Sequence, residues 1–240
     1  MKHSNDQTDQ QLSDIKSFYE DIYYADCDNK LNLPRHYFKL KNRLGLYAEQ
    51  SLLDVACGRG EWLKVNQKLG LRVSGIDLSE KAIETCRANM PDGDFHACSA
   101  DVLPFADRSF DAVTCLGSLE HFVDPVGCLR EMVRVAKPDA QIVILVPNLD
   151  FLTRKLGIFG GTHQTDAKEE VRTLDEWGKI FVQAGLRVES RWKDLHVLSW
   201  SWIAKGRKLM WPVRALQALL LTVWPLRWQY QVYHKCSIDR

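Results

Sequence analysis

The stretch that decides the fold is Ser51-Leu-Leu-Asp-Val-Ala-Cys-Gly-Arg-Gly60. Apolar residues flank a single carboxylate, Asp54, which is typical of a parallel strand buried on both faces. Gly58 and Gly60 permit backbone angles that other residues avoid, and they let a ligand approach the main chain. Apolar residues at helical spacing then lead to Gly70, which predicts a helix ending there. Strand, glycine turn and helix together indicate a nucleoside-binding crevice at the carboxyl ends of a parallel sheet.

A glycine turn can also join a strand to a helix for steric reasons alone, so the following segments matter. Leu71-Arg-Val-Ser-Gly-Ile-Asp77 predicts a second strand that ends in a carboxylate at a spacing suited to ribose hydroxyls. Ser79 is placed to cap the next helix. Further strands are expected over 94–99, 109–116 and 141–147. Asp101, after the third strand, could accept from an adenine amino group. The simpler interpretations are a turn former for Asp77 and a helix cap for Asp101.

The turn does not match a dinucleotide site well. Leu63 occupies the position of the third glycine in the Gly-x-Gly-x-x-Gly motif that places a pyrophosphate on a helix amino terminus. Carboxylates flank the turn, which suits a ligand with positive charge and no phosphate. A nucleotide-dependent oxidoreductase therefore stays an alternative that Leu63 disfavours.

The chain resembles the class I S-adenosylmethionine-dependent methyltransferases, in the type 11 branch that includes quinone-biosynthesis enzymes. The resemblance covers residues 51 to about 148, and it rests on Asp54-x-x-Cys-Gly-x-Gly60, Gly75-Ile-Asp77, Ala100-Asp-Val-Leu-Pro-Phe105, Ser109-Phe-Asp-Ala-Val113 and Arg134-Val-Ala-Lys-Pro138. It implies an α/β fold: a Rossmann-like, doubly wound, seven-stranded sheet, mostly parallel with an antiparallel last strand and helices on both faces. It also implies S-adenosyl-L-methionine as cofactor and a methyl-transfer reaction.

The resemblance also implies which residues bind the cofactor. Asp77 would bind the ribose diol, Asp101 with Val102 the adenine, and Leu116 would lie beside the methionine end. The remaining expected contacts come from the glycine turn and the second strand end: Asp54, Ala56, Cys57, Gly58, Gly60 and Leu78. Ala56 replaces the family's first glycine, and Cys57 is expected to be a small filler. No metal site is expected.

Composition suits one α/β domain with appended pieces, because the chain has 240 residues of which 45% are apolar. The expected organisation is a helical lid over 1–50, a methyltransferase domain over 51–194 plus 229–240, and a basic helical insertion over 195–228. Aromatic residues in the first segment, at helical spacing, form either a lid over the cofactor or a plain amphipathic helix. Seven unclustered cysteines indicate free thiols in a reducing compartment, and no secretory signal is recognised.

The insertion has a distinctive composition. Between Leu195 and Ile238 there are six lysines and arginines, five of the eight tryptophans and no acidic residue. Its longest uncharged apolar run, 215–226, is too short to cross a bilayer, which takes about 20 residues. Tryptophan with basic residues is typical of a helix in the lipid headgroup layer. The alternatives are a helical cover on the sheet and, less favoured, a nucleic-acid surface. The expected location is cytoplasmic or peripheral on the inner face of a membrane; the oligomeric state is left open.

Methyl transfer to a hydroxyl needs a base, and three residues are candidates. His121 follows the fourth strand, His163 lies in a loop after the fifth strand, and Glu120 is a carboxylate alternative. His121 could instead only orient the helix that begins at Asp124-Pro125.

The sequence therefore predicts transfer of a methyl group to an oxygen, less so a carbon or nitrogen, of a small-molecule or lipid-linked acceptor. The functional alternative is a cofactor-binding pseudo-methyltransferase that acts as a scaffold or assembly module.

Overall fold

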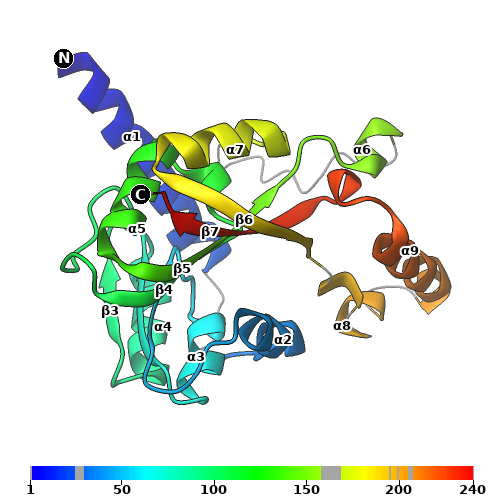
Figure 1. Ribbon diagram of the computed structural model, residues 1–240, viewed down its shortest axis with the longest axis horizontal. Coiled ribbons are helices and arrows are strands. Elements are labelled where there is room, and N and C mark those ends of the chain that lie inside the picture. Colours follow the sequence, from blue (N-terminus) through cyan, green and yellow to red (C-terminus); the bar gives the residue numbers. More distant parts are fainter. Residues whose placement is uncertain are drawn as a thin grey trace.

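A computed structural model describes residues 2–24, 30–157, 169–194, 196–198, 200–204 and 208–239. Within these residues the strands form one sheet in the order β3-β2-β1-β4-β5-β7-β6 (Figure 1). The strands are β1 Ser51–Val55, β2 Arg72–Asp77, β3 Asp94–Ala97, β4 Phe110–Leu116, β5 Ala136–Pro147, β6 Leu186–Lys193 and β7 Gln231–Ile238. Only β7 runs antiparallel to its neighbours β5 and β6. The predicted seven-stranded, mostly parallel sheet is confirmed.

Helices cover both faces of the sheet, as predicted (Figure 1). On one face α5 and α7 pack against β1, β4 and β5; on the other face lie α2, α3 and α4. These helices are α2 Arg35–Leu44, α3 Glu61–Gln67, α4 Glu80–Asn89, α5 Pro125–Val135 and α7 Leu174–Gln183. The predicted cap at Ser79 is confirmed, since its side chain accepts a backbone N–H of the helix that follows. The side chains of Asp124 and Thr173 cap α5 and α7 in the same way.

Several element ends differ from the predictions. Strand β5 begins at Ala136 rather than 141, because a bulge opposite Phe110 and Ala112 lets the pairing with β4 continue. The last strand begins at Gln231 instead of 229. Gln229 lies just before the strand, where its buried side chain donates to the carbonyl of Asp194 (2.9 Å). Helix α3 stops at 67 rather than at the glycine of position 70.

The segments outside the sheet carry the remaining helices. The chain starts with α1 Lys2–Phe18, which continues into the π-helical turn η1 Tyr19–Tyr23. Short elements occur after β4 and β5 as η2 Leu119–His121 and α6 Leu152–Lys155. Between β6 and β7 lie η3 His196–Leu198, α8 Trp200–Ile203, η4 Lys208–Met210, α9 Trp211–Val223 and η5 Leu226–Trp228. In the described part of the chain, no helix has the length and apolarity that a bilayer crossing requires.

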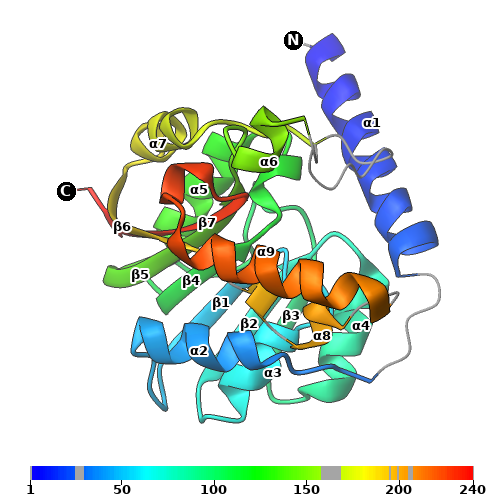
Figure 2. The same ribbon diagram turned by 90° about the vertical axis from the view of Figure 1, so that its right-hand side faces the viewer.

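Figure 2 looks onto the carboxyl ends of the parallel strands. Helix α1 runs along one side of this rim, and α9 lies in front of it; Figure 1 likewise places α8 and α9 beyond the end of β6. Parallel strands present their carboxyl ends at one edge, where ligands of such sheets bind. The sheet therefore brings the amino-terminal helix, the strand ends and the insertion to one side of the molecule.

Candidate functional site

A cavity of about 490 Å³ opens at this rim. Its walls come from the ends of β1, β2, β3 and β4, and from the amino-terminal helix. Eight of the ten cofactor contacts expected from the sequence line it, and they are Asp54, Ala56, Cys57, Gly58, Asp77, Leu78, Asp101 and Leu116. Gly60 and Val102 are not part of its lining. A pocket of this size, with convergent carboxylates, has the dimensions of a small-molecule site.

Asp77 holds the glycine turn in place. Its Oδ2 accepts the backbone N–H of Gly58 (2.8 Å), and its Oδ1 accepts that of Ser79 (2.9 Å). Burial raises the pKa of Asp77, while these backbone N–H groups lower it. Each carboxylate oxygen has two lone pairs, so both retain the capacity to accept a ligand hydroxyl.

Asp54 is buried at the end of β1, beside the same turn. The hydroxyl of Thr114 donates to its Oδ1 (2.6 Å), and the Trp62 indole N–H donates to that hydroxyl (3.1 Å). Burial raises the pKa of Asp54 to about 8, against the hydrogen bond from Thr114. No lysine or arginine of the described residues forms an ion pair with Asp54, Asp77 or Asp101. Glu61, which also lines the cavity, pairs with Arg59 (3.0 Å). The three aspartates without a basic partner favour a ligand that carries positive charge.

The three small residues of the turn, Ala56, Gly58 and Gly60, are small for different structural reasons. Ala56 has φ +60°, so it adopts the left-handed conformation that glycine would adopt without strain. At Gly58 a Cβ would lie 2.9 Å from the Tyr24 hydroxyl, inside the cavity. At Gly60 a Cβ would instead collide with Met90 and Cys86. Gly60 is therefore needed for packing, and its predicted contact with the cofactor stays a prediction.

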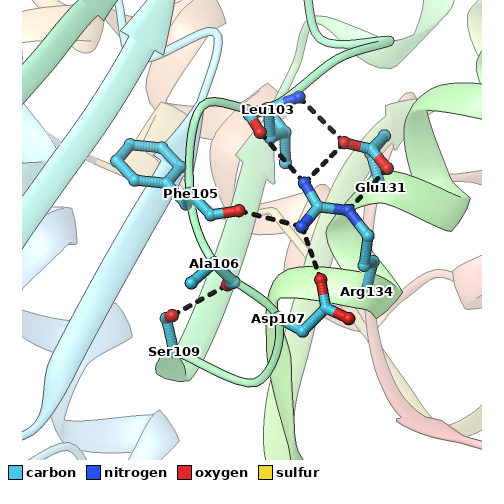
Figure 3. Close-up of polar contacts among 7 residues, drawn as sticks. All are labelled: Leu103, Phe105, Ala106, Asp107, Ser109, Glu131 and Arg134. Carbon is cyan, nitrogen blue, oxygen red and sulfur yellow. Dashed lines mark hydrogen bonds and ion pairs between the residues drawn. The ribbon is translucent and has the colours of Figure 1, made fainter.

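Asp101 lies at the edge of the cavity, and Val102 beside it is largely exposed. The contact predicted between Val102 and the adenine stays a prediction. The loop that follows is held by Arg134 of α5 (Figure 3). The guanidinium donates to the carbonyls of Leu103 (2.9 Å) and Phe105 (2.8 Å).

The same arginine is itself held by carboxylates (Figure 3). Arg134 contacts Asp107 (2.7 Å) and Glu131 (2.7 Å), and Glu131 also accepts the N–H of Leu103 (2.9 Å). The hydrogen bond from Arg134 lowers the pKa of Glu131. This network, which the sequence alone did not reveal, fixes the loop that presents Asp101.

Aromatic side chains close the cavity from the amino-terminal side. Tyr19, Tyr23 and Tyr24 line it, with ring centroids 4.9–6.2 Å apart. Their segment is attached to α4, because Glu20 accepts the N–H of Glu80 (3.1 Å). The amino-terminal segment therefore contributes aromatic side chains to the cavity wall.

Sequence reasoning missed three residues of the cavity and its support: Tyr37, Trp62 and Thr114. Tyr37 and Trp62 line the cavity and pack against each other at 5.6 Å. A proline just before the helix that carries Tyr37, at position 34, was the available signal for a helix start. Nothing in the sequence marked Thr114, which lies inside an apolar strand.

The three predicted bases differ in whether they reach the cavity. His121 lines the main cavity and a smaller one of about 160 Å³ next to it. Glu120 lines only the smaller cavity; burial raises its pKa to about 8, and its Oε2 has no hydrogen-bond partner among the described residues. His163 lies outside the described residues. The structure thus brings His121, but not Glu120, to the cavity wall.

The cysteines that the structure describes are free, including Cys57 and Cys86, whose sulfur atoms are 4.0 Å apart. A hydrogen bond to Cys86 and burial raise the pKa of Cys57, so it is a packed thiol rather than a reactive one. The described residues contain no cluster of histidine, cysteine and carboxylate side chains able to hold a metal.

Comparisons with known proteins find methyltransferases. The family described as "Methyltransferase domain" matches residues 53–144. A demethylmenaquinone methyltransferase of Renibacterium salmoninarum is 40% identical over 101 residues, which is 42% of this chain and 43% of that protein. The chain spans 38–50% of the length of three such relatives.

One longer match covers most of both chains. A ubiquinone biosynthesis O-methyltransferase of Pseudomonas entomophila is 30% identical over 68% of this chain and 73% of its own length. Among solved structures, a SAM-dependent methyltransferase from Aquifex aeolicus superposes with a TM-score of 0.58 at 19% identity, over 95% of this chain and 98% of that one. That structure supports the fold alone.

Proposed function

Because the chain belongs to the class I S-adenosylmethionine-dependent methyltransferase family, we propose that it binds S-adenosyl-L-methionine in the rim cavity and methylates a small, amphiphilic acceptor. The observation that supports this proposal most is the carboxylate-lined cavity beside the glycine turn. The donor is a cation, and three of the lining carboxylates, Asp54, Asp77 and Asp101, have no basic partner among the described residues. The bound cofactor supplies an already activated methyl group.

We assign the binding roles as follows. Asp77 accepts hydrogen bonds from the ribose diol, Asp101 binds the adenine amino group, and the backbone from Ala56 to Gly58 lies along the methionine end. Asp77 follows Gly58 by 19 residues, a spacing suited to ribose hydroxyls. Its carboxylate already accepts the N–H of Gly58, so a ribose bound to it would lie beside the turn. The protein then aligns donor and acceptor, an effect worth up to ~7–11 kcal/mol in favourable systems.

We propose an oxygen as the acceptor atom. The longer relative is named an O-methyltransferase, which supports this choice, whereas the shorter relatives are named demethylmenaquinone methyltransferases. A hydroxyl must lose its proton during transfer, and His121 on the cavity wall is one candidate to accept it. Residues 1–50 act as the lid, 51–194 plus 229–240 as the catalytic domain, and 195–228 as an appended insertion.

We further propose that the insertion docks on an anionic lipid surface. Helix α9 turns Ala218 and Leu221 toward the protein and leaves large apolar side chains exposed. These exposed residues, from α9 and the segments before it, are Trp200, Leu209, Met210, Val213, Leu216, Leu219, Leu220 and Val223. An exposed apolar patch of this kind marks an interaction surface.

The charge around this patch favours lipid as its partner. The segment from 196 to 238 contains no acidic residue, and Lys208 and Arg227 are exposed beside α9. Basic residues near an anionic bilayer contribute about 1 kcal/mol each. Lys193 donates to the carbonyls of Leu221 (3.3 Å) and Thr222 (2.9 Å), which ties the end of α9 to β6. In this proposal α9 contacts lipid at the rim of the sheet where the cavity also opens.

Co-sedimentation with vesicles of phosphatidylglycerol and phosphatidylcholine tests the docking. A Leu216→Asp/Leu219→Asp variant should lose most of the bound fraction. Val182→Asp on α7, an equally exposed apolar position on another helix, is the matched control and should bind like the wild type. Equal pelleting of the α9 variant and the control would contradict membrane docking without touching the cofactor assignment.

The cofactor assignment itself is tested with radiolabelled S-adenosylmethionine and lipid and polar extracts. Transfer of label to an extract component supports an enzyme. Tight cofactor binding without transfer to any fraction would favour the scaffold alternative.

A further inference from the structure

An ion pair lies in the wall of the cofactor cavity, within the glycine turn. Arg59 stands between Gly58 and Gly60, and its Nη2 lies 3.0 Å from Oε1 of Glu61, the first residue of α3. Both residues line the cavity, and their side chains are 19% and 24% exposed. An ion pair between residues this close in the chain adds little to stability. Folding alone therefore does not explain a charged pair at this position.

The charge of the cavity makes Arg59 exceptional. Among the described residues that line the cavity, Arg59 is the only lysine or arginine. Five carboxylates line it as well, and they are Asp54, Glu61, Asp77, Asp101 and Asp124. An anionic group placed among carboxylates is costly unless it pairs with a cation. Arg59 is therefore the strongest partner that the cavity offers to a carboxylate of a ligand.

The order of the strands indicates which end of the methyl donor meets Arg59. Strands β3, β2 and β1 are neighbours in the sheet, in this order. Asp101 follows β3, Asp77 ends β2, and Arg59 follows β1. In the proposed binding mode Asp101 holds the adenine and Asp77 the ribose. The methionine chain, which is the third part of the donor, then extends toward β1 and ends in an α-carboxylate beside an α-ammonium group.

The surroundings of Arg59 suit a carboxylate. A guanidinium presents its N–H groups in a planar fork that matches the two oxygens of a carboxylate. The contact with Glu61 keeps this fork in the cavity wall. Burial raises the pKa of Tyr37, and the carboxylates of Asp54 and Glu61 raise it further, so Glu61 lies near this phenol. Tyr37 packs on Trp62 at 5.6 Å, and these two rings form the wall next to the ion pair.

We propose that Arg59 binds the α-carboxylate of the donor's methionine chain and that Glu61 orients the guanidinium for this contact. This inference rests on the proposed function and adds a binding residue to it. Arg59 then makes the cavity selective for adenosine ligands with an amino-acid end. S-adenosylmethionine and S-adenosylhomocysteine bind in preference to methylthioadenosine, which has the same nucleoside and sulfur but no amino-acid end.

Isothermal titration calorimetry with three ligands tests this role: S-adenosylhomocysteine, its decarboxylated analogue and methylthioadenosine. Arg59→Gln should weaken S-adenosylhomocysteine roughly tenfold to 100-fold, the effect of losing hydrogen bonds between charged groups. Its affinity for the other two ligands should not fall, because neither has the carboxylate. Arg59→Lys should recover part of the loss, since lysine keeps the charge but not the planar fork.

Lys68→Gln is the matched control. Lys68 is exposed at the end of α3 and is not part of the cavity lining, so this variant removes the same charge outside the cavity. It should bind all three ligands like the wild type. The wild type should itself prefer S-adenosylhomocysteine to the decarboxylated analogue, a comparison that needs no variant to fold.

Three results would overturn the role of Arg59. They are equal affinities of the wild type for S-adenosylhomocysteine and its decarboxylated analogue, an Arg59→Gln protein that binds S-adenosylhomocysteine like the wild type, and a parallel loss for all three ligands in that variant. The last result would mean that Arg59 only supports the shape of the turn. A folded wild type that binds none of the three ligands would instead overturn the proposed function.

Discussion

Replacing Arg134 by alanine should loosen the loop that presents Asp101. The guanidinium makes two hydrogen bonds to loop carbonyls and pairs with Glu131 and the exposed Asp107 (Figure 3). Hydrogen bonds with one charged partner contribute ~1.5–3 kcal/mol each, and Arg134 is about one-third exposed, so the lower end applies. The pair with Asp107 contributes little, because exposed ion pairs are worth ~0–1 kcal/mol. The expected loss is about 2–3 kcal/mol.

Urea denaturation followed by tryptophan fluorescence measures this loss. For a chain of this size, ~1 kcal/mol corresponds to a Tm shift of roughly 2–4 °C. Arg134→Lys should recover part of the loss, because lysine can reach one carbonyl but not both. Arg130→Ala on the same helix is the matched control, since Arg130 makes one longer bond, to the carbonyl of Gln183 (3.2 Å).

The Arg134→Ala protein should also bind S-adenosylmethionine more weakly, by roughly threefold to tenfold, because a mobile loop must be ordered on binding. An unfolding free energy within about 0.5 kcal/mol of the wild type would refute the reasoning. Equal losses for the Arg130 and Arg134 variants would refute it as well.

Three other predictions follow from the same site. Ala56→Gly should raise stability by up to ~1 kcal/mol, because a left-handed alanine is strained by more than the entropy that glycine loses; lower stability in urea denaturation would contradict this. Asp54, with a pKa of about 8, is protonated at pH 7 in the free protein, and a cationic ligand lowers that pKa. Binding of S-adenosylmethionine should therefore release close to one proton at pH 7 and tighten from pH 6 to 8. Calorimetry in buffers of different ionisation enthalpy measures the release, and a buffer-independent enthalpy would oppose it. Glu20→Ala should speed amide exchange in Tyr19–Tyr24 about twofold to fivefold, since it removes one exposed hydrogen bond; Asp21→Ala is the control, and equal rates would argue against the attachment.

The sequence predicted the sheet well, because each strand of the first half ends at a clear chemical boundary. Buried parallel strands are mostly apolar runs, and the acidic residues in the last two positions of β1 and β2 mark their carboxyl ends. The helix caps were equally readable, since a serine, aspartate or threonine before an apolar helix satisfies free backbone N–H groups. Strand ends and helix caps depend on residues that are neighbours in the chain, so a single sequence is enough to recognise them.

The parts that depend on tertiary contacts were not predictable. The packing of Gly60 against Met90 and Cys86 has no local signal, because these two side chains come from another part of the chain. The Arg134 network joins α5 to a loop about thirty residues earlier. The ring of His196 likewise lies near that of His36, which is distant in the sequence. The start of the last strand was wrong for the same reason, since Gln229 is used to hold Asp194.

Isothermal titration calorimetry with S-adenosylhomocysteine tests the central claim most directly. The account predicts one site per chain for the wild type and a loss of at least about tenfold in affinity for Asp77→Ala, whose carboxylate would no longer meet the ribose. NAD should give no heat under the same conditions. Absence of binding by the folded wild-type protein, or tighter binding of NAD, would contradict the assignment of this cavity to a methyl donor.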